Sequence, residues 1–178
     1  MSWEQDSDYP RPQFRRANWV SLNGPCKFTF DDARQFSQPA DIKSWSQEIT
    51  VPFAPETPAF DIAVTSFHHV CWYEREFQLL PAPNPDMSSG PRFHLHFGAV
   101  DYVARVWVNG HFQGVHEGGR VPFSFDVTDS LSATGVQTVT VKVEDDPLDL
   151  AKPRGKQDWQ LEPHSIWYPP TTGIWQTV

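Results

Sequence analysis

The chain has 178 residues, of which 39% are apolar and 14% aromatic, so it carries enough apolar surface for one packed domain and is not a wholly disordered protein. Its 14 basic and 22 acidic residues give a formal net charge of −8, and no run of Lys or Arg could track a phosphate backbone, which excludes nucleic acid as an expected partner. No stretch approaches the roughly 20 consecutive apolar residues that span a bilayer, and the first residues lack the features of a signal peptide, so we expect no membrane partner and, by default, a cytoplasmic location.

Short strands are expected in the first part of the chain. The chain's 17 Pro and 10 Gly are scattered so that no apolar stripe of helical period persists between them. Lys27–Phe30 alternates after an Asn-Gly-Pro turn and predicts a strand. The polar stretch Asp31–Glu48 predicts a connection with a short helical turn around Trp45, and Ile49–Val51 predicts a second short strand.

Residues Val70 to Leu80 show clean alternation and predict a longer strand. One face, which carries Cys71, Tyr73, Phe77 and Leu79, is expected to be buried, and the other, which carries Trp72, Glu74, Glu76 and Gln78, is expected to be solvated. Arg75 shares the apolar face, so its guanidinium needs a carboxylate or carbonyl partner. Asp101 and Asp126 are the candidate carboxylates.

The second half of the chain is more regular. Apolar residues alternate through segments 93–97, 104–108, 121–127 and 139–143, and Asn109-Gly110 predicts a type I′ hairpin. Turn signals recur about every ten residues, a spacing typical of a β-sandwich or jelly roll rather than of βαβ units. Residues 144–170 predict a long loop before Ile174–Val178 resumes as a strand, and loops of this length in compact domains are usually functional.

The 2 cysteines, Cys26 and Cys71, both fall in predicted strands. Strand cysteines usually act as small core hydrophobes, so we expect buried free thiols, with a disulfide as the alternative. A zinc site built on this pair would need further ligands at a spacing that the sequence does not offer.

Several short motifs occur together in one order. They are Leu95–Tyr102 (LHFGAVDY), Val106–Gly110 (VWVNG), His116–Gly119 (HEGG), Phe125–Thr128 (FDVT), Pro153–Gln157 (PRGKQ) and Ile166–Val178 (IWYPPTTGIWQTV). Together they resemble the N-terminal sugar-binding domain of family 2 glycoside hydrolases, which include β-galactosidases, β-glucuronidases and β-mannosidases. The resemblance covers residues 19–178 and implies an all-β fold, an antiparallel jelly-roll β-sandwich of the galactose-binding-domain type. It leaves residues 1–18 as a loose N-terminal segment.

The resemblance also implies which parts of the enzyme lie elsewhere. In the family an immunoglobulin-like domain and a (β/α)₈ barrel follow this domain, and the barrel carries the two catalytic glutamates. No position of this chain corresponds to them, and Val178 falls where the last strand of the domain is still running. We therefore expect a fragment that is inactive alone, whose partners are the missing domains and, weakly, carbohydrate. A homo-oligomer stays open, and no cofactor is implied.

The segment from Asp145 to Tyr168 is the candidate sugar site. Sugar sites combine carboxylates and amides, which bond hydroxyl groups, with aromatic rings that face the sugar ring. The candidates at the sugar rim are Asp145, Asp146, Arg154, Lys156, Gln157, Trp159, Trp167 and Tyr168. In some galactosidases of the family a carboxylate after the equivalent strand contacts the terminal sugar, and Asp146 is the nearest match. The alternative is that the charged residues pair with one another and the Trp residues pack the loop.

Other residues that could act as catalytic acids or metal ligands are interpreted as structural. Glu74 and Glu76 lie two residues apart on one strand face, near the separation that retaining hydrolysis uses, but the face is expected to be solvated. His94 and His96 have a spacing that metal sites use, yet a third ligand is needed. We expect no catalytic residue and no metal site in this chain.

Two functions remain after these exclusions. The preferred one is an accessory domain of a β-glycosidase that shapes the rim of the active site. The alternative is an autonomous, lectin-like carbohydrate-binding module.

Overall fold

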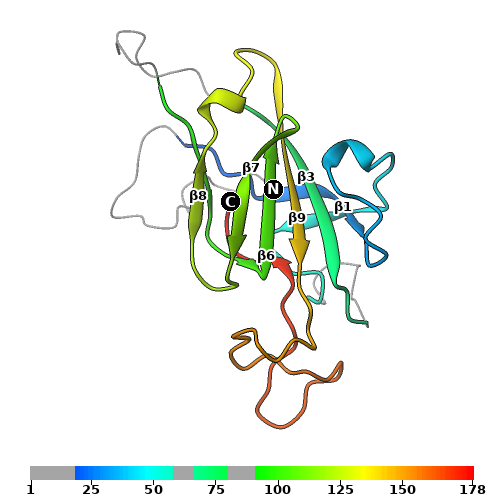
Figure 1. Ribbon diagram of the computed structural model, residues 1–178. Helices are drawn as coiled ribbons and strands as arrows, with labels where there is room; N and C mark the ends of the chain where they lie inside the picture. The colour runs from blue at the N-terminus through cyan, green and yellow to red at the C-terminus, as the bar shows by residue number, and fades with distance from the viewer. Residues whose placement is uncertain (1–18, 58–65, 80–90) are drawn as a thin grey trace.

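The computed structural model describes residues 19–57, 66–79 and 91–178. The expected loose segment 1–18 and most of the predicted connection 81–91 lie outside the described residues. The described part is an antiparallel β-sandwich with only short 3₁₀ turns besides its strands, which confirms the expected fold class (Figure 1).

A six-stranded antiparallel sheet forms one layer, in the order β2-β1-β3-β9-β6-β7. Its strands are β1 (Gly24–Phe30), β2 (Gln47–Val51), β3 (Val70–Gln78), β6 (Val103–Val108), β7 (His111–Glu117) and β9 (Val136–Glu144). Two shorter antiparallel pairs face it, namely β4 (His94–Phe97) with β8 (Phe123–Asp126), and β5 (Val100–Asp101) with β10 (Gly173–Ile174). Sequentially distant strands pair in every layer, as Greek-key connections require.

The main core lies between these layers. Every second residue of the central strands points into it, so Cys71 and Tyr73 of β3 pack beside Val106 of β6 and Val141 of β9. Phe28 contacts Tyr73 edge to face, with ring centroids 4.9 Å apart. The alternation read from the sequence therefore predicts the inward face correctly.

The expectation that the opposite face of β3 is solvated is wrong at Trp72. This side chain is fully buried and stacks on Trp107, with ring centroids 5.4 Å apart, beneath Phe36 and Trp45. The segment between β1 and β2 folds over the sheet because the buried carboxylate of Asp31 holds it there. That carboxylate accepts hydrogen bonds from the backbone N–H groups of residues 35 and 36 and from Nε1 of Trp72.

The predicted hairpin is confirmed, and one predicted turn lies at a different place in the chain. Asn109 and Gly110 both have positive φ, 50° and 79°, between β6 and β7, as a type I′ turn demands. The helical turn expected around Trp45 is instead a 3₁₀ turn at Pro39–Asp41, where Asp41 accepts hydrogen bonds from two backbone N–H groups.

Arg75 finds carbonyl partners rather than a carboxylate. Its guanidinium donates hydrogen bonds to the backbone oxygens of Pro25 and Asn23, so neither Asp101 nor Asp126 serves it. The charge therefore stays at the end of β1 and does not enter the core.

Both cysteines are buried free thiols, as expected. Burial raises the pKa of Cys26 to about 11, and burial also raises the pKa of Cys71. Thiolate chemistry is therefore suppressed at both positions.

The long connection between β9 and β10 leaves the sandwich at one end. Figure 1 shows it as the orange loops beyond the ends of β6 and β9. It contains turns and one isolated bridge, Gln157 with Tyr168, and no strand among its residues, all of which are described. The chain returns to the core at Gly173, where Tyr73 packs against the glycine backbone.

Candidate functional site

Gln157 anchors the long connection to the core. Its Nε2 donates to Oδ2 of Asp101 at 2.7 Å, and its Oε1 accepts from the backbone N–H of Thr171 at 2.6 Å. Main-chain bonds from Tyr168 N to Lys156 O and from Asp158 N to Tyr168 O close the same loop. One buried amide therefore ties both arms of the connection to β5.

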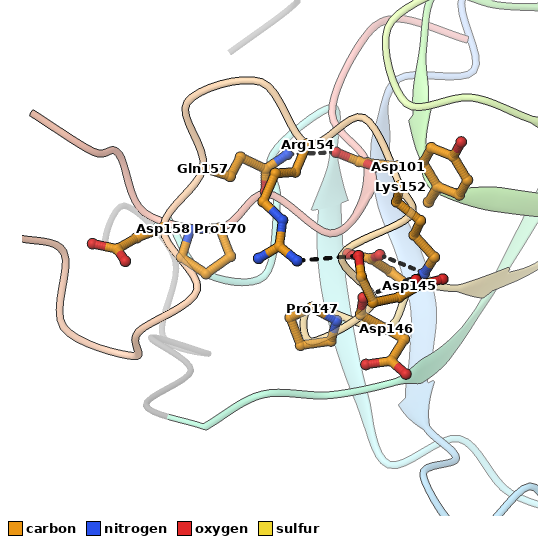
Figure 2. Close-up of a pocket in the computed structure, with 11 residues that line it drawn as sticks. Asp101, Asp145, Asp146, Pro147, Lys152, Arg154, Gln157, Asp158 and Pro170 are labelled. Carbon is orange, nitrogen blue, oxygen red and sulfur yellow. Dashed lines mark hydrogen bonds and ion pairs between the residues drawn. The ribbon is translucent and has the colours of Figure 1, made fainter.

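Asp145 and Lys152 form an ion pair beneath the loop (Figure 2). Lys152 Nζ lies 3.2 Å from Oδ1 of Asp145, and the two side chains are 17% and 11% exposed. The same ammonium lies 5.2 Å from the ring centroid of Tyr102. The Asp145 carboxylate is thus committed to holding the loop.

Asp146 and Arg154 are less enclosed. The side chain of Asp146 is 47% exposed; its carboxylate accepts a hydrogen bond from the backbone N–H of Leu148 at 3.0 Å and lies 3.6 Å from Nδ1 of His69. Nη2 of Arg154 donates to the carbonyl of Asp149 at 3.1 Å, while the Arg154 carbonyl accepts from Arg120. Asp146 is therefore the predicted acid whose carboxylate keeps the most room for a ligand.

Burial dominates the electrostatics under the loop. Desolvation, with a smaller contribution from the charge of Asp145, raises the pKa of Asp101 to about 6. Desolvation likewise raises the pKa of Asp145, against the opposing charge of Lys152. The fold therefore holds two acids close together in a region that disfavours their charge.

The enclosed space at this place is too small for a sugar. Asp101, Asp145, Asp146, Arg154 and Gln157 line a cavity of about 20 Å³, which is room for about one water molecule. The structure brings these residues together as a polar support, and the space between them has no room for a sugar ring.

Two of the three aromatic candidates, Trp159 and Tyr168, are exposed, and Trp167 is half-buried. Trp159 is 42% exposed and meets Trp167 edge to face, with ring centroids 5.3 Å apart, while Tyr168 is 63% exposed. Lys156 is also exposed. These four residues lie outside the small cavity, so the predicted set divides into a supporting group and an exposed group.

The sequence analysis missed Asp158, which organises the exposed group. This buried carboxylate accepts hydrogen bonds from Nδ1 and the backbone N–H of His164, both at 2.7 Å, and from the backbone N–H of Gln160. Burial opposes its charge, but these hydrogen bonds outweigh it, so the pKa of Asp158 is lowered. Its carboxylate points away from the supporting cluster (Figure 2). The adjacent Trp159 was the only signal for it.

The other chemical candidates are accounted for structurally. Glu74 and Glu76 both pair with Nζ of Lys27, at 2.8 and 3.1 Å, which indicates a surface ion-pair cluster. His94 and His96 have ring centroids 6.0 Å apart. Within residues 19–57, 66–79 and 91–178, no three metal-ligating side chains gather in a way that could hold an ion. Nor does that part of the chain contain a helix that could cross a membrane.

A family model for the sugar binding domain of glycosyl hydrolases family 2 matches residues 19–162. The chain belongs to this family. Among its relatives, the β-galactosidase of Thermoanaerobacter pseudethanolicus is 28% identical over 159 residues, which are 88% of this chain and 18% of that protein. The β-glucuronidase of Felis catus is 32% identical over 180 residues, which are 95% of this chain and 25% of that protein.

Solved structures of family 2 enzymes share the fold. The Faecalibacterium prausnitzii β-glucuronidase superposes with a TM-score of 0.59 and 30% sequence identity, over 75% of this chain and 22% of that chain. The Lactobacillus rhamnosus β-glucuronidase gives a TM-score of 0.58 with 26% identity, over 71% of this chain and 21% of that one. This family 2 sugar-binding domain thus spans a quarter or less of the relatives named here.

Proposed function

We propose that this chain is the accessory sugar-binding domain of a family 2 β-glycosidase, and that residues 145–172 contribute to the rim of the sugar site formed with the rest of such an enzyme. The family match over residues 19–162 carries the proposal. On this view hydrolysis of the glycosidic bond belongs to a catalytic domain with which the sandwich is partnered, and the sandwich alone turns over no glycoside. A cytoplasmic location is part of the same proposal.

The construction of the loop supports a role in presentation. Its inner side is fixed by the Asp101–Gln157 hydrogen bond and the Asp145–Lys152 pair, while Trp159 and Tyr168 stay exposed. A rigid support beneath exposed rings lowers the entropy lost when a ligand or another domain is bound.

Turnover assays test the accessory role directly. The purified chain is incubated with p-nitrophenyl β-galactoside and p-nitrophenyl β-glucuronide, and we expect no release of nitrophenol above buffer. The reason is that retaining hydrolysis needs two carboxyl groups about 5–5.5 Å apart around the bond, whereas Glu74 and Glu76 are held by Lys27. Glycosidase turnover by this chain would overturn the proposal.

A second candidate, the autonomous carbohydrate-binding module, is favoured by the exposed Trp159 and Tyr168. Titration calorimetry with galactose, glucuronate, mannose and oligosaccharides separates the two functions. Dissociation constants well below ~1 mM, corresponding to more than about 4 kcal/mol, would favour the module. Trp159→Ala should then abolish binding, and Phe112→Ala, which removes another exposed ring on β7, serves as the matched control.

A further inference from the structure

Three polar side chains that do not belong to residues 145–172 form a connected relay. Nδ1 of His68 lies 2.6 Å from Oδ2 of Asp32, and Nε2 of His68 lies 3.0 Å from Oγ of Ser66. An ionised carboxylate only accepts hydrogen bonds, so Nδ1 carries the proton and donates a hydrogen bond to Asp32. Nε2 is then the acceptor for the hydroxyl of Ser66. This order of carboxylate, imidazole and hydroxyl is that of an activated serine nucleophile.

The imidazole at the centre of the relay is fixed from two sides. Its ring stacks on Phe30, the last residue of β1, with centroids 3.6 Å apart and planes 14° from parallel. Oδ1 of Asp32 accepts from the backbone N–H of His69 at 2.7 Å, which holds the carboxylate beside the ring. Partial burial opposes the charge of Asp32, but the hydrogen bonds from His68 and His69 outweigh it and the pKa of Asp32 is lowered. A general base needs this fixed tautomer and orientation.

A cavity adjoins the two reactive groups. It has a volume of about 140 Å³ and is lined by Glu56, Ser66, Phe67 and His68, together with Pro147, Leu161, Pro169, Pro170 and Thr172 of the long connection. A water molecule occupies about 30 Å³ in the liquid, so the space admits a group of a few heavy atoms. No Lys or Arg stands among the described residues of the lining to pair with an anionic group, and the one acid among them is Glu56. The cavity therefore suits an uncharged acyl group.

We propose that Ser66, His68 and Asp32 form a nucleophilic site that hydrolyses small, uncharged acyl esters, with the acyl group seated in this cavity. Ser66, His68 and Asp32 lie outside the supporting and the exposed group of the long loop, although that loop contributes part of the cavity wall. Ser66 and His68 act on the ester itself, whereas Asp32 is a positioning residue.

The reaction needs only the ester and water. Oγ of Ser66 forms a bond to the ester carbonyl carbon while its proton passes to Nε2 of His68. The bond between the carbonyl carbon and the alcohol oxygen then breaks, and the leaving alcohol takes that proton. Water next attacks the acyl carbon and gives a proton to Nε2. The bond between the acyl carbon and Oγ then breaks, the acid is released, and the proton returns from Nε2 to Oγ. No oxidant, reductant or metal enters the balance.

The test measures hydrolysis of p-nitrophenyl acetate by the full 178-residue chain. We expect turnover that Ser66→Ala abolishes and that His68→Gln lowers at least about a hundredfold, the usual range for loss of a general base. Asp32→Asn should present an amide N–H to Nδ1, impose the other tautomer and lower kcat at least about tenfold with KM unchanged. Ser37→Ala, His111→Gln and Asp129→Asn remove the same groups elsewhere and should leave the rate unchanged.

Covalent labelling supplies an independent readout. Phenylmethylsulfonyl fluoride should sulfonylate Oγ of Ser66 with loss of fluoride, giving one modified peptide by mass spectrometry, and His68→Gln should slow that labelling in parallel. Ser66 is exposed, so its alanine variant should keep the wild-type thermal melt and report on the nucleophile alone. The proposal is overturned by the absence of turnover and labelling, by turnover that persists in Ser66→Ala, or by labelling that is indifferent to His68.

Discussion

At Asp101, burial opposes the ionisation of the carboxyl group. The carboxyl is 6% exposed, and its pKa stands at about 6 against roughly 3.9 in an unfolded chain. Because the folded state holds this proton more tightly, the stability that Asp101 contributes is full below about pH 4 and is lost as the pH rises through 6, by up to about 3 kcal/mol. Asp101→Asn removes the titration while its amide oxygen still accepts from Gln157. We therefore expect it to be more stable than the wild type at pH 7.5, with the gap shrinking at pH 4.5.

Urea unfolding of the two proteins at both pH values measures this difference. Asp129→Asn, an exposed carboxyl, controls for the general loss of one negative charge. Equal stabilities of wild type and Asp101→Asn at both pH values would show that Asp101 does not titrate where we place it.

Gly173 shows how a single missing Cβ sets the start of a strand. Its φ is +84°, and a Cβ at this position would overlap the hydroxyl of Tyr73. Gly173→Ala should therefore lower the free energy of unfolding by at least about 2 kcal/mol, from backbone strain and overpacking together. Gly110→Ala has a similar φ of +79° and open space around it, so it isolates the backbone contribution.

A double-mutant cycle separates the steric part at Gly173. Tyr73→Phe removes the overlapping oxygen, so Gly173→Ala should be less damaging in that background. Strict additivity of the two substitutions would argue against the overlap.

At the scale of elements, sequence alternation located most strands but misjudged what covers them. In β9 the residues from Val139 to Val143 are all buried, including Thr140 and Lys142, because the segment 31–46 covers the outer face. That segment is polar in sequence, and its folding depends on contacts of Asp31 with distant Trp72. Local sequence patterns do not encode such a contact. The alternation in β9 therefore predicts one exposed face, whereas both faces of this strand are buried.

The candidate residues of the loop could be chosen from the sequence, but their arrangement could not. The sequence singled out the loop because its length and its acids and Trp residues were unusual. It could not separate Asp145, which is occupied by Lys152, from Asp146, which is more exposed. It assigned Asp101 to Arg75 as a candidate partner instead of to Gln157, and it overlooked Asp158 as a buried acceptor, since burial comes from the folded loop and not from the neighbouring residues in the chain.

Removing the side-chain amide of Gln157 should loosen the connection between β9 and β10. Gln157→Ala leaves the buried Asp101 carboxylate without its donor and removes the acceptor of the Thr171 backbone N–H. This should destabilise the folded loop by about 1–3 kcal/mol. We expect trypsin to cut faster after Arg154 and Lys156 in this variant. Gln160→Ala changes an exposed neighbour and should leave the cleavage rate unchanged. An unchanged rate in Gln157→Ala as well would show that the amide does not anchor the loop.

At the scale of the whole molecule, two hydrophobic clusters share the same strands. Val106 belongs to the main core and Trp107 to the outer cluster, although they are adjacent on β6 and point to opposite faces. Because neither cluster can lose its strands without exposing the other, the sandwich should unfold as one cooperative unit. The covering segment 31–46 is then part of the domain and not a detachable flap.

This cooperativity predicts how two neighbouring substitutions behave. Val106→Ala should lower the free energy of unfolding by about 2 kcal/mol and Trp107→Ala by about 3–5 kcal/mol, because both side chains are buried and leave a cavity. Both should shift a single urea transition, with circular dichroism and Trp fluorescence coinciding and the slope with denaturant unchanged. A separate early transition in Trp107→Ala, seen by fluorescence alone, would instead mean that the outer cluster melts independently. In that case the face bearing Trp72 could be uncovered while the sandwich stays folded.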